Sequence, residues 1–167
     1  MRQRLFRIAV FPIALCAVVM SMPLVARAIL AELSLPDLVQ MSDHIVRAKV
    51  LSTSSAWNDD RTQILTTVII RIDESYSGRL ADSSQAMVML PGGVVDGLAM
   101  EVEHSPVFVV GEDVIVFLTD IDNKHCRVSG WEAGKFSVEN GRVVENGLSM
   151  LQFKKQIEIA VKSAGQR

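Results

Sequence analysis

Residues 64–76 carry the strongest secondary-structure signal in the chain, a long alternation in which every second side chain is suited to a buried face. Thr66, Val68 and Ile70 fall on one side, and threonine, valine and isoleucine are favoured in strands. Side chains repeat every two residues in a strand and every 3.6 residues in a helix. The segment therefore predicts a long, half-buried strand, and other segments of the chain must supply the strands that pair with it.

Further strands are predicted on both sides of this one. Residues 45–51 alternate, with Val46 and Val50 on the apolar face, whereas the polar residues 52–61 predict an exposed loop. Residues 114–118 are apolar throughout, which predicts a central strand buried on both faces. The remaining predicted strands are residues 86–90, 98–103, 126–130, 135–139 and 142–145, and an Asn140-Gly141 turn joins the last two.

A helix is predicted at each end of this set of strands. Ser34, Pro36 and Asp37 are typical of a helix start, so a short helix to about residue 41 follows. Ser149 and Gln152 form a capping box for a C-terminal helix over residues 149–164. Its apolar stripe consists of Phe153, Ile157, Ala160 and Ala164. Six to eight short strands between two helices indicate a mainly β protein, either a barrel or a closed sandwich.

The first 28 residues predict a cleaved export signal. Three arginines precede an apolar run at residues 8–25, and Ala26-Arg27-Ala28 supplies the small residues at which signal peptidase cuts. The run is close to the ~20 residues that span a bilayer, so a retained anchor is the alternative. Pro12 and Pro23 weaken a straight spanning helix. A lipoprotein signal does not fit, because Cys16 lies within the run and follows a leucine.

Cleavage after Ala28 leaves residues 29–167, enough for a single domain with one modest core. This part holds 13 Lys and Arg against 19 Asp and Glu, a net charge of −6, which disfavours nucleic acid and anionic lipid as partners. Cys126 is its only cysteine, so an internal disulfide is impossible. The thiol is either buried in a strand or paired with another chain. We expect a periplasmic or secreted protein that meets the membrane only through its signal.

Residues 42–52 resemble the opening strand of netrin-like domains, which include the tissue inhibitors of metalloproteinases. Their sequence is Ser-Asp-His-Ile-Val-Arg-Ala-Lys-Val-Leu-Ser, and the strand ending at Tyr76, Pro91-Gly92-Gly93 and Gly111-Glu112-Asp113 follow in matching order. The likeness covers residues 42–134, and it extends to exported bacterial proteins of unknown role. It implies an OB-like, five-stranded Greek-key barrel with a flanking helix.

The same resemblance implies a protease as the partner, with one departure from the family. The inhibitors chelate the zinc of their target through an N-terminal cysteine that disulfides anchor to the barrel. The predicted mature terminus here is Ile29, followed by Leu30. Inhibition by the same means is therefore not expected.

The three histidines and the cysteine are the candidate catalytic residues. His44, His104 and His125 each stand next to an acid, a hydroxyl or a thiol, but neighbouring side chains of a strand point to opposite faces. A hydrolase that uses Cys126 or a histidine is the enzymatic alternative, for example with Cys126 as nucleophile and His44 or His104 as base.

The sequence predicts neither a metal site nor a cofactor. Residues 120–124 alternate oxygen-bearing side chains but lack the glycine and distal glutamate of an EF-hand, which favours a solvated turn. Pro91-Gly92-Gly93 with Gly97 has neither the lysine nor the spacing of a phosphate loop. Few aromatic residues and an acidic balance disfavour a nucleic-acid surface.

Four residues are candidates for partner binding: Trp57 and Trp131, which could anchor a ligand, and Gly92 and Gly93, which let the backbone approach closely. Alternatively, the rings cover the barrel mouth and the glycines permit a bulge or bend. We expect an exported binding protein without catalysis, and a structural component of the envelope is a further alternative.

Overall fold

The computed structural model describes residues 33–82 and 84–165, all within one compact unit, Glu32–Arg167. The predicted signal peptide, residues 1–28, lies outside the described residues. No helix in the described ranges combines the length and the apolar character needed to cross a membrane. The elements are α2 (Leu35–Gln40), β1 (His44–Trp57), β2 (Ile64–Ser77), the 3-10 turn η1 (Arg79–Asp82), β3 (Gln85–Pro91), β4 (Gly93–Val95), β5 (Leu98–Met100), β6 (Asp113–Asp120), β7 (His125–Val128), the 3-10 turn η2 (Trp131–Gly134), β8 (Lys135–Glu139), β9 (Arg142–Val143) and α3 (Met150–Ala164).

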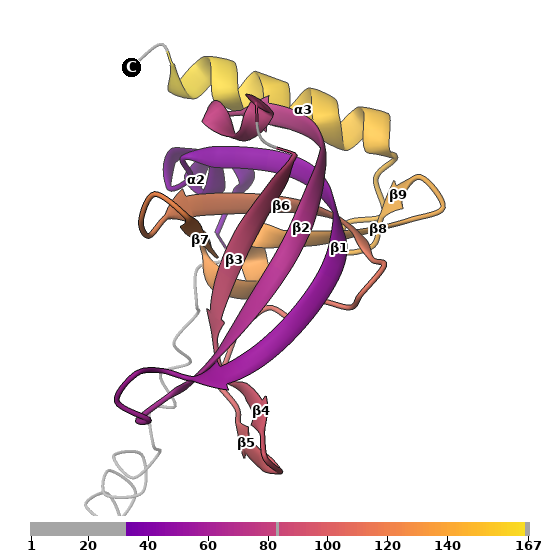
Figure 1. Cartoon of the computed structure of the whole chain (residues 1–167). Helices are drawn as coiled ribbons and strands as arrows, with labels where there is room; N and C mark the ends of the chain where they lie inside the picture. Colours follow the sequence, from indigo (N-terminus) through magenta and orange to yellow (C-terminus); the bar gives the residue numbers. More distant parts are fainter. Residues whose placement is uncertain (1–32, 83, 166–167) are drawn as a thin grey trace, which may run out of the picture. The chain divides into compact units, whose positions relative to one another are not determined.

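Seven strands form one large mixed sheet in the order β1-β2-β3-β7-β6-β8-β9, and β4 and β5 form a small separate hairpin (Figure 1). β1 also pairs with β6, so the pairings of β1, β2, β3, β7 and β6 return to β1. Only β3 and β7 run parallel to each other among the paired strands described. The protein is therefore mainly β, as predicted, with the helices α2 and α3.

β1 and β2 pair from end to end over 14 residues each. The prediction of a loop at residues 52–61 is wrong for its first half, because β1 continues to Trp57, which pairs with Ile64. This end of β1 extends past the core, so its side chains are mostly exposed and show no apolar alternation. The observed loop is closed by Asn58, whose side-chain oxygen accepts hydrogen bonds from the N–H groups of Thr62 and Gln63.

β6 is buried on both faces, as its apolar sequence predicts. Val114 and Leu118 face a first core cluster, made with the inner faces of β1, β2, β3 and β7. Ile115 and Phe117 face a second cluster, which the helices α2 and α3 cover from outside (Figure 1). The ring centroids of Phe136 and Phe117 lie 5.8 Å apart, so Phe136 links β8 to this second core.

Both helices begin with the predicted capping serine. Ser34 caps α2 together with Asp37, and Ser149 caps α3 together with Gln152. α3 buries Phe153, Ile157 and Ala160, while Ala164 is half-buried. Lys154 on α3 pairs with Glu74 on β2, which fastens the helix to the sheet.

Three strands are shorter than predicted. β5 ends at Met100, where the chain leaves the β4–β5 hairpin. β7 ends at Val128, because Gly130 and Trp131 adopt left-handed φ angles, far from those of an extended strand. β9 stops at Val143, since the carboxylate of Glu145 takes the N–H of Ser137 on β8 in place of a backbone carbonyl.

Candidate binding site

A pocket opens where the parallel strands β3 and β7 separate. The two strands pair only at Met87 with His125 and at Val88 with Cys126. Beyond that point, residues 89–91 of β3, residues 127–128 of β7 and the following Ser129 line a pocket of about 500 Å³, here called the β3–β7 pocket. Its lining includes Leu90 and Val128, which belong to the first core. The pocket therefore reaches the core between two diverging strands.

Exposed apolar side chains gather at this pocket. Four of the thirteen large apolar residues that the structure exposes line it: Leu33 at 38 %, Met41 at 50 %, Ile121 at 51 % and Trp131 at 51 % exposure. They come from the segment before α2, its C-terminal end, the turn after β6 and η2. A concave apolar site with exposed apolar residues at its edge is the usual form of a binding site.

Trp131 is held at this pocket by a strained backbone. Its φ of 58° follows a φ of 69° at Gly130, and the left-handed region costs a residue with a Cβ about 1–2 kcal/mol. The next residue fixes the turn, since the N–H of Glu132 donates to the carbonyl of His104 at 2.9 Å. Glu132 Oε1 also lies 2.7 Å from His104 Nδ1. These bonds hold a large aromatic ring half exposed, although the backbone conformation there is unfavourable.

Arg127 is the only charged residue among the described residues that line the β3–β7 pocket. It lies opposite Thr119 in the β6–β7 pairing, and within the described ranges it forms no ion pair. Thr119 is occupied already, because its hydroxyl bonds Ser129 Oγ at 2.7 Å and donates to the carbonyl of Met41 at 2.7 Å. The guanidinium is thus the group best placed to receive an anion there.

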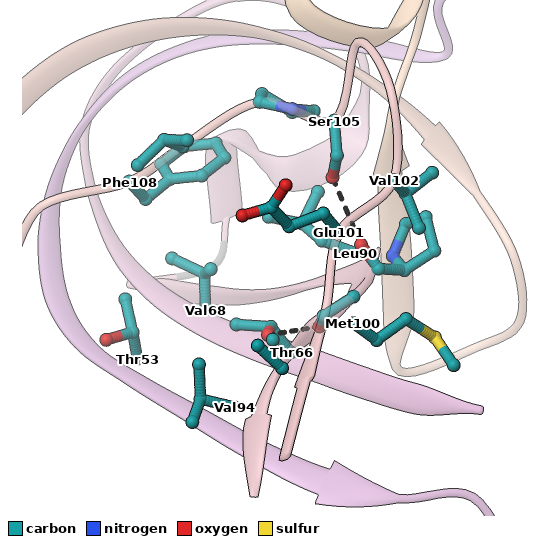
Figure 2. A pocket seen from close by; sticks show the side chains of 16 residues that line it. Thr53, Thr66, Val68, Leu90, Val94, Met100, Glu101, Val102, Ser105 and Phe108 are labelled. Atoms are coloured by element: carbon teal, nitrogen blue, oxygen red, sulfur yellow. Dashed lines mark hydrogen bonds between the residues drawn. The ribbon is translucent and has the colours of Figure 1, made fainter. Parts of the chain in front are cut away.

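A second pocket, of about 480 Å³, lies between the end of β3, the β4–β5 hairpin and the loop at residues 101–108. Figure 2 shows Phe108 and Glu101 at one end of it and Val94 at the other. Both pockets include Leu90, Pro91 and Pro106, so these residues separate them.

Gly92 and Gly93 line this second pocket and make the bend between β3 and β4. Their φ angles are 94° and 138°, and a Cβ on Gly93 would lie 2.4 Å from the hydroxyl oxygens of Ser55 and Thr66. The carbonyl of Gly92 accepts a hydrogen bond from Thr66 at 2.6 Å (Figure 2). The bend itself thus requires glycine.

Trp57 lies apart from Trp131. It ends β1, is half-buried, and lines neither the β3–β7 pocket nor the second pocket. Of the four candidates from the sequence, the structure places Trp131 at one pocket and Gly92 and Gly93 at the other.

Cys126 and His44 meet at one carboxylate. Asp120 Oδ1 lies 3.1 Å from His44 Nε2, and the thiol of Cys126 donates to the same oxygen at 3.4 Å. The N–H of Arg79 donates to His44 Nδ1, so the ring proton is on Nε2 and points to Asp120. Burial, and then Asp120, raise the pKa of Cys126 to about 12. A thiol in this state is a poor nucleophile.

The other two histidines also face carboxylates. His104 pairs with Glu132, and His125 Nδ1 lies 2.8 Å from Asp122 Oδ2. In residues 33–82 and 84–165, no histidine is hydrogen-bonded to a hydroxyl or a thiol. The arrangement does not join a nucleophile to a base.

The carboxylate of Asp122, in the acidic turn after β6, is hydrogen-bonded by other residues of the same turn. The hydrogen bond with the His125 ring, and then those from the N–H groups of Lys124 and His125, lower the pKa of Asp122 to about 2. In the described part of the chain, no cluster of three or more His, Cys, Asp or Glu could hold a metal ion.

Sequence reasoning did not single out Met41, Ile121 or Arg127. Each has ordinary surface neighbours in the sequence. They come together because β6 pairs with β7 and because the hydroxyls of Thr119 and Ser129 bond the carbonyl of Met41. Comparison of the sequence with protein-family models and with curated proteins gives no match.

Proposed function

We propose that this protein is an exported, non-catalytic binding protein that binds a protein partner at the β3–β7 pocket. The observation that carries the proposal is Trp131, whose ring is half exposed at an apolar pocket on a left-handed backbone. Strained conformations persist where the surrounding structure imposes them, and they are common at ligand sites. Tryptophan is also among the residues that contribute most to protein interfaces.

The proposal includes an OB-like barrel of the netrin type. It is supported by the five strands whose pairings return to β1, by the non-consecutive pairs β1–β6 and β3–β7, and by the resemblance of residues 42–134. Such partly open barrels bind ligands on a strand face and at the adjoining loops. Export rests on the N-terminal sequence, and fold alone does not assign a function.

A protease is the partner class that the resemblance suggests. Since the proposed mature terminus is Ile29 rather than cysteine, the contact would be made by the β3–β7 pocket and not by chelation of a catalytic zinc. The proposal therefore predicts that any inhibition of a captured protease is lost when the pocket is altered.

Affinity capture tests the proposal, with the exported protein immobilised and the exported fraction of the producing cells applied. Captured proteins are identified by mass spectrometry, purified, and titrated against wild-type protein, Trp131→Ala and the matched control Trp57→Ala. Loss of an anchoring tryptophan costs on the order of 2–4 kcal/mol, so Trp131→Ala weakens binding about 30-fold or more. Trp57→Ala leaves the affinity within about threefold.

The proposal fails if Trp131→Ala binds the captured protein as tightly as the wild type. It fails equally if no purified protein binds in solution. Thermal unfolding of each variant verifies that a loss of affinity does not reflect loss of the fold.

A further inference from the structure

We propose that the β3–β7 pocket recognises the C-terminal end of a partner chain, with an apolar last residue and its carboxylate beside Arg127. This inference rests on the binding function proposed above and names the chemistry of the partner.

The backbone of the two strands favours an extended ligand. β3 and β7 run parallel and stop pairing after Val88 and Cys126, so residues 89–91 and 127–129 line the pocket without pairing with each other. Unpaired strand edges bind extended peptides through main-chain hydrogen bonds, and pockets select their side chains.

The ends of the pocket favour a chain terminus over an internal segment. One end is closed, because Val88 and Cys126 are paired there. At the other end lie Pro106 and Trp131, and Ser105 Oγ fastens this loop to the carbonyl of Pro91 at 3.2 Å. An internal segment would have to turn outward where the strands pair, whereas a terminal residue can stop there.

Charge sets the direction of the ligand. Arg127 directly follows Cys126 in β7 and lines the pocket. Arginine binds carboxylates with two parallel N–H donors, and the described residues of the pocket include no acid that would repel one. The terminal carboxylate therefore lies beside Arg127.

The apolar residues of the pocket select the last side chain. Met41 and Ile121 lie on the β6 side and Trp131 follows β7, all about half exposed. Methionine adapts to different shapes, so the site accepts several large apolar residues at the last position.

A library of peptides displayed with free C-termini tests the inference, using the protein purified after export. We expect enrichment of a large apolar residue at the last position. The selected peptide is then synthesised as the free acid and as the C-terminal amide, and both are titrated by fluorescence anisotropy. Amidation weakens binding to the wild type about tenfold or more, because a charge-assisted pair is lost.

Substitutions locate the effect. Arg127→Gln weakens binding of the free acid about tenfold and removes the difference in affinity between acid and amide. The matched control Arg61→Gln keeps the affinity for the acid and keeps that difference. Trp131→Ala and, as a second variant at an exposed position, Ile121→Asn weaken acid and amide alike.

The inference is overturned if no peptide is enriched, if acid and amide bind equally to the wild type, or if Arg127→Gln preserves their difference. Captured proteins distinguish this failure from failure of the binding function. If the peptide test fails and binding of a captured partner still depends on Trp131, the binding function stands and only C-terminal recognition is excluded. If binding of the partner does not depend on Trp131 either, both proposals are excluded.

Discussion

Cys126 is the residue on which the binding and catalytic hypotheses differ most directly. Its side chain is buried, its thiol donates to Asp120, and its pKa is raised to about 12. Alkylation requires the thiolate. We therefore predict that iodoacetamide at pH 8 leaves Cys126 unmodified in the folded protein and modifies it fully in urea, as measured by intact mass. Rapid modification of the folded protein would instead support the hydrolase alternative.

His104 gives the fold a pH-dependent contact beside Trp131. The hydrogen bond that the His104 ring donates to Glu132, and then the charge of Glu132, raise the pKa of His104. The contact therefore stabilises the protein fully below the unfolded pKa of about 6.5, and this stabilisation is lost as the pH rises through the higher folded pKa.

We predict that Glu132→Gln lowers the pKa of His104 more than Glu103→Gln does, as read from an NMR titration of the imidazole. Glu103 is the weaker partner, with Oε1 3.5 Å from His104 Nε2 against 2.7 Å for Glu132. Equal effects of the two substitutions would contradict the pairing.

Lys135 and Glu112 form a largely buried ion pair at 2.6 Å that joins β8 to the turn before β6. Burial raises the pKa of Glu112, but hydrogen bonds from Lys135, Ser137 and the N–H of Val109 outweigh it and lower the pKa overall. Lys135→Met leaves the carboxylate short of a partner. We predict a loss of on the order of 1–3 kcal/mol in the free energy of unfolding, measured in urea at pH 7.

Lys154→Met is the matched control, since Lys154 pairs with Glu74 at positions that are both more than a third exposed. Pairs of this kind contribute about 0–1 kcal/mol. If the two lysine substitutions lower the free energy of unfolding equally, burial does not decide the strength of these ion pairs.

The η2 turn depends on close packing against β7. A Cβ on Gly134 would lie 1.9 Å from the carbonyl oxygen of Ser129, so the backbone would have to move. We predict that Gly134→Ala lowers the free energy of unfolding by on the order of 3 kcal/mol. Gly97→Ala, at the exposed tip of the β4–β5 hairpin with no atom within 4 Å of a new Cβ, costs only about 1 kcal/mol for its φ of 78°. A similar cost for both variants would show that η2 tolerates displacement.

Elements that follow a local rule were predictable from the sequence. β6 was evident from its unbroken apolar run, and α3 from its stripe and its cap at Ser149. The second half of β1 was not, because residues 52–57 extend past the core and have no apolar face. Pairing with β2, rather than burial, makes them a strand.

The candidate site was predictable only in part, for a reason of the same kind. Trp131 stands out as a large aromatic near turn residues, and the sequence analysis named it. The β3–β7 pocket depends on the pairing of Met87 with His125, which is non-local, and on where that pairing stops. Periodicity carries no information about either.

At the scale of the whole molecule, two cores divide the faces of the sheet. The helices α2 and α3 cover the second core, so the face beneath them is occupied by the chain itself. The first core is enclosed by the strands and is reached from outside between β3 and β7, where Leu90 and Val128 line the pocket. A partner bound there contacts the first core and leaves the second unchanged.

NMR of the methyl-labelled protein titrated with a captured, purified partner tests this account most directly. We predict that the NMR signals of the Trp131 indole N–H and of the Leu90 and Val128 methyl groups shift. The methyl signals of Val143 and Ile157 in the second core stay unchanged. Shifts confined to the second core, or an unchanged Trp131 signal on binding, would contradict binding at the β3–β7 pocket.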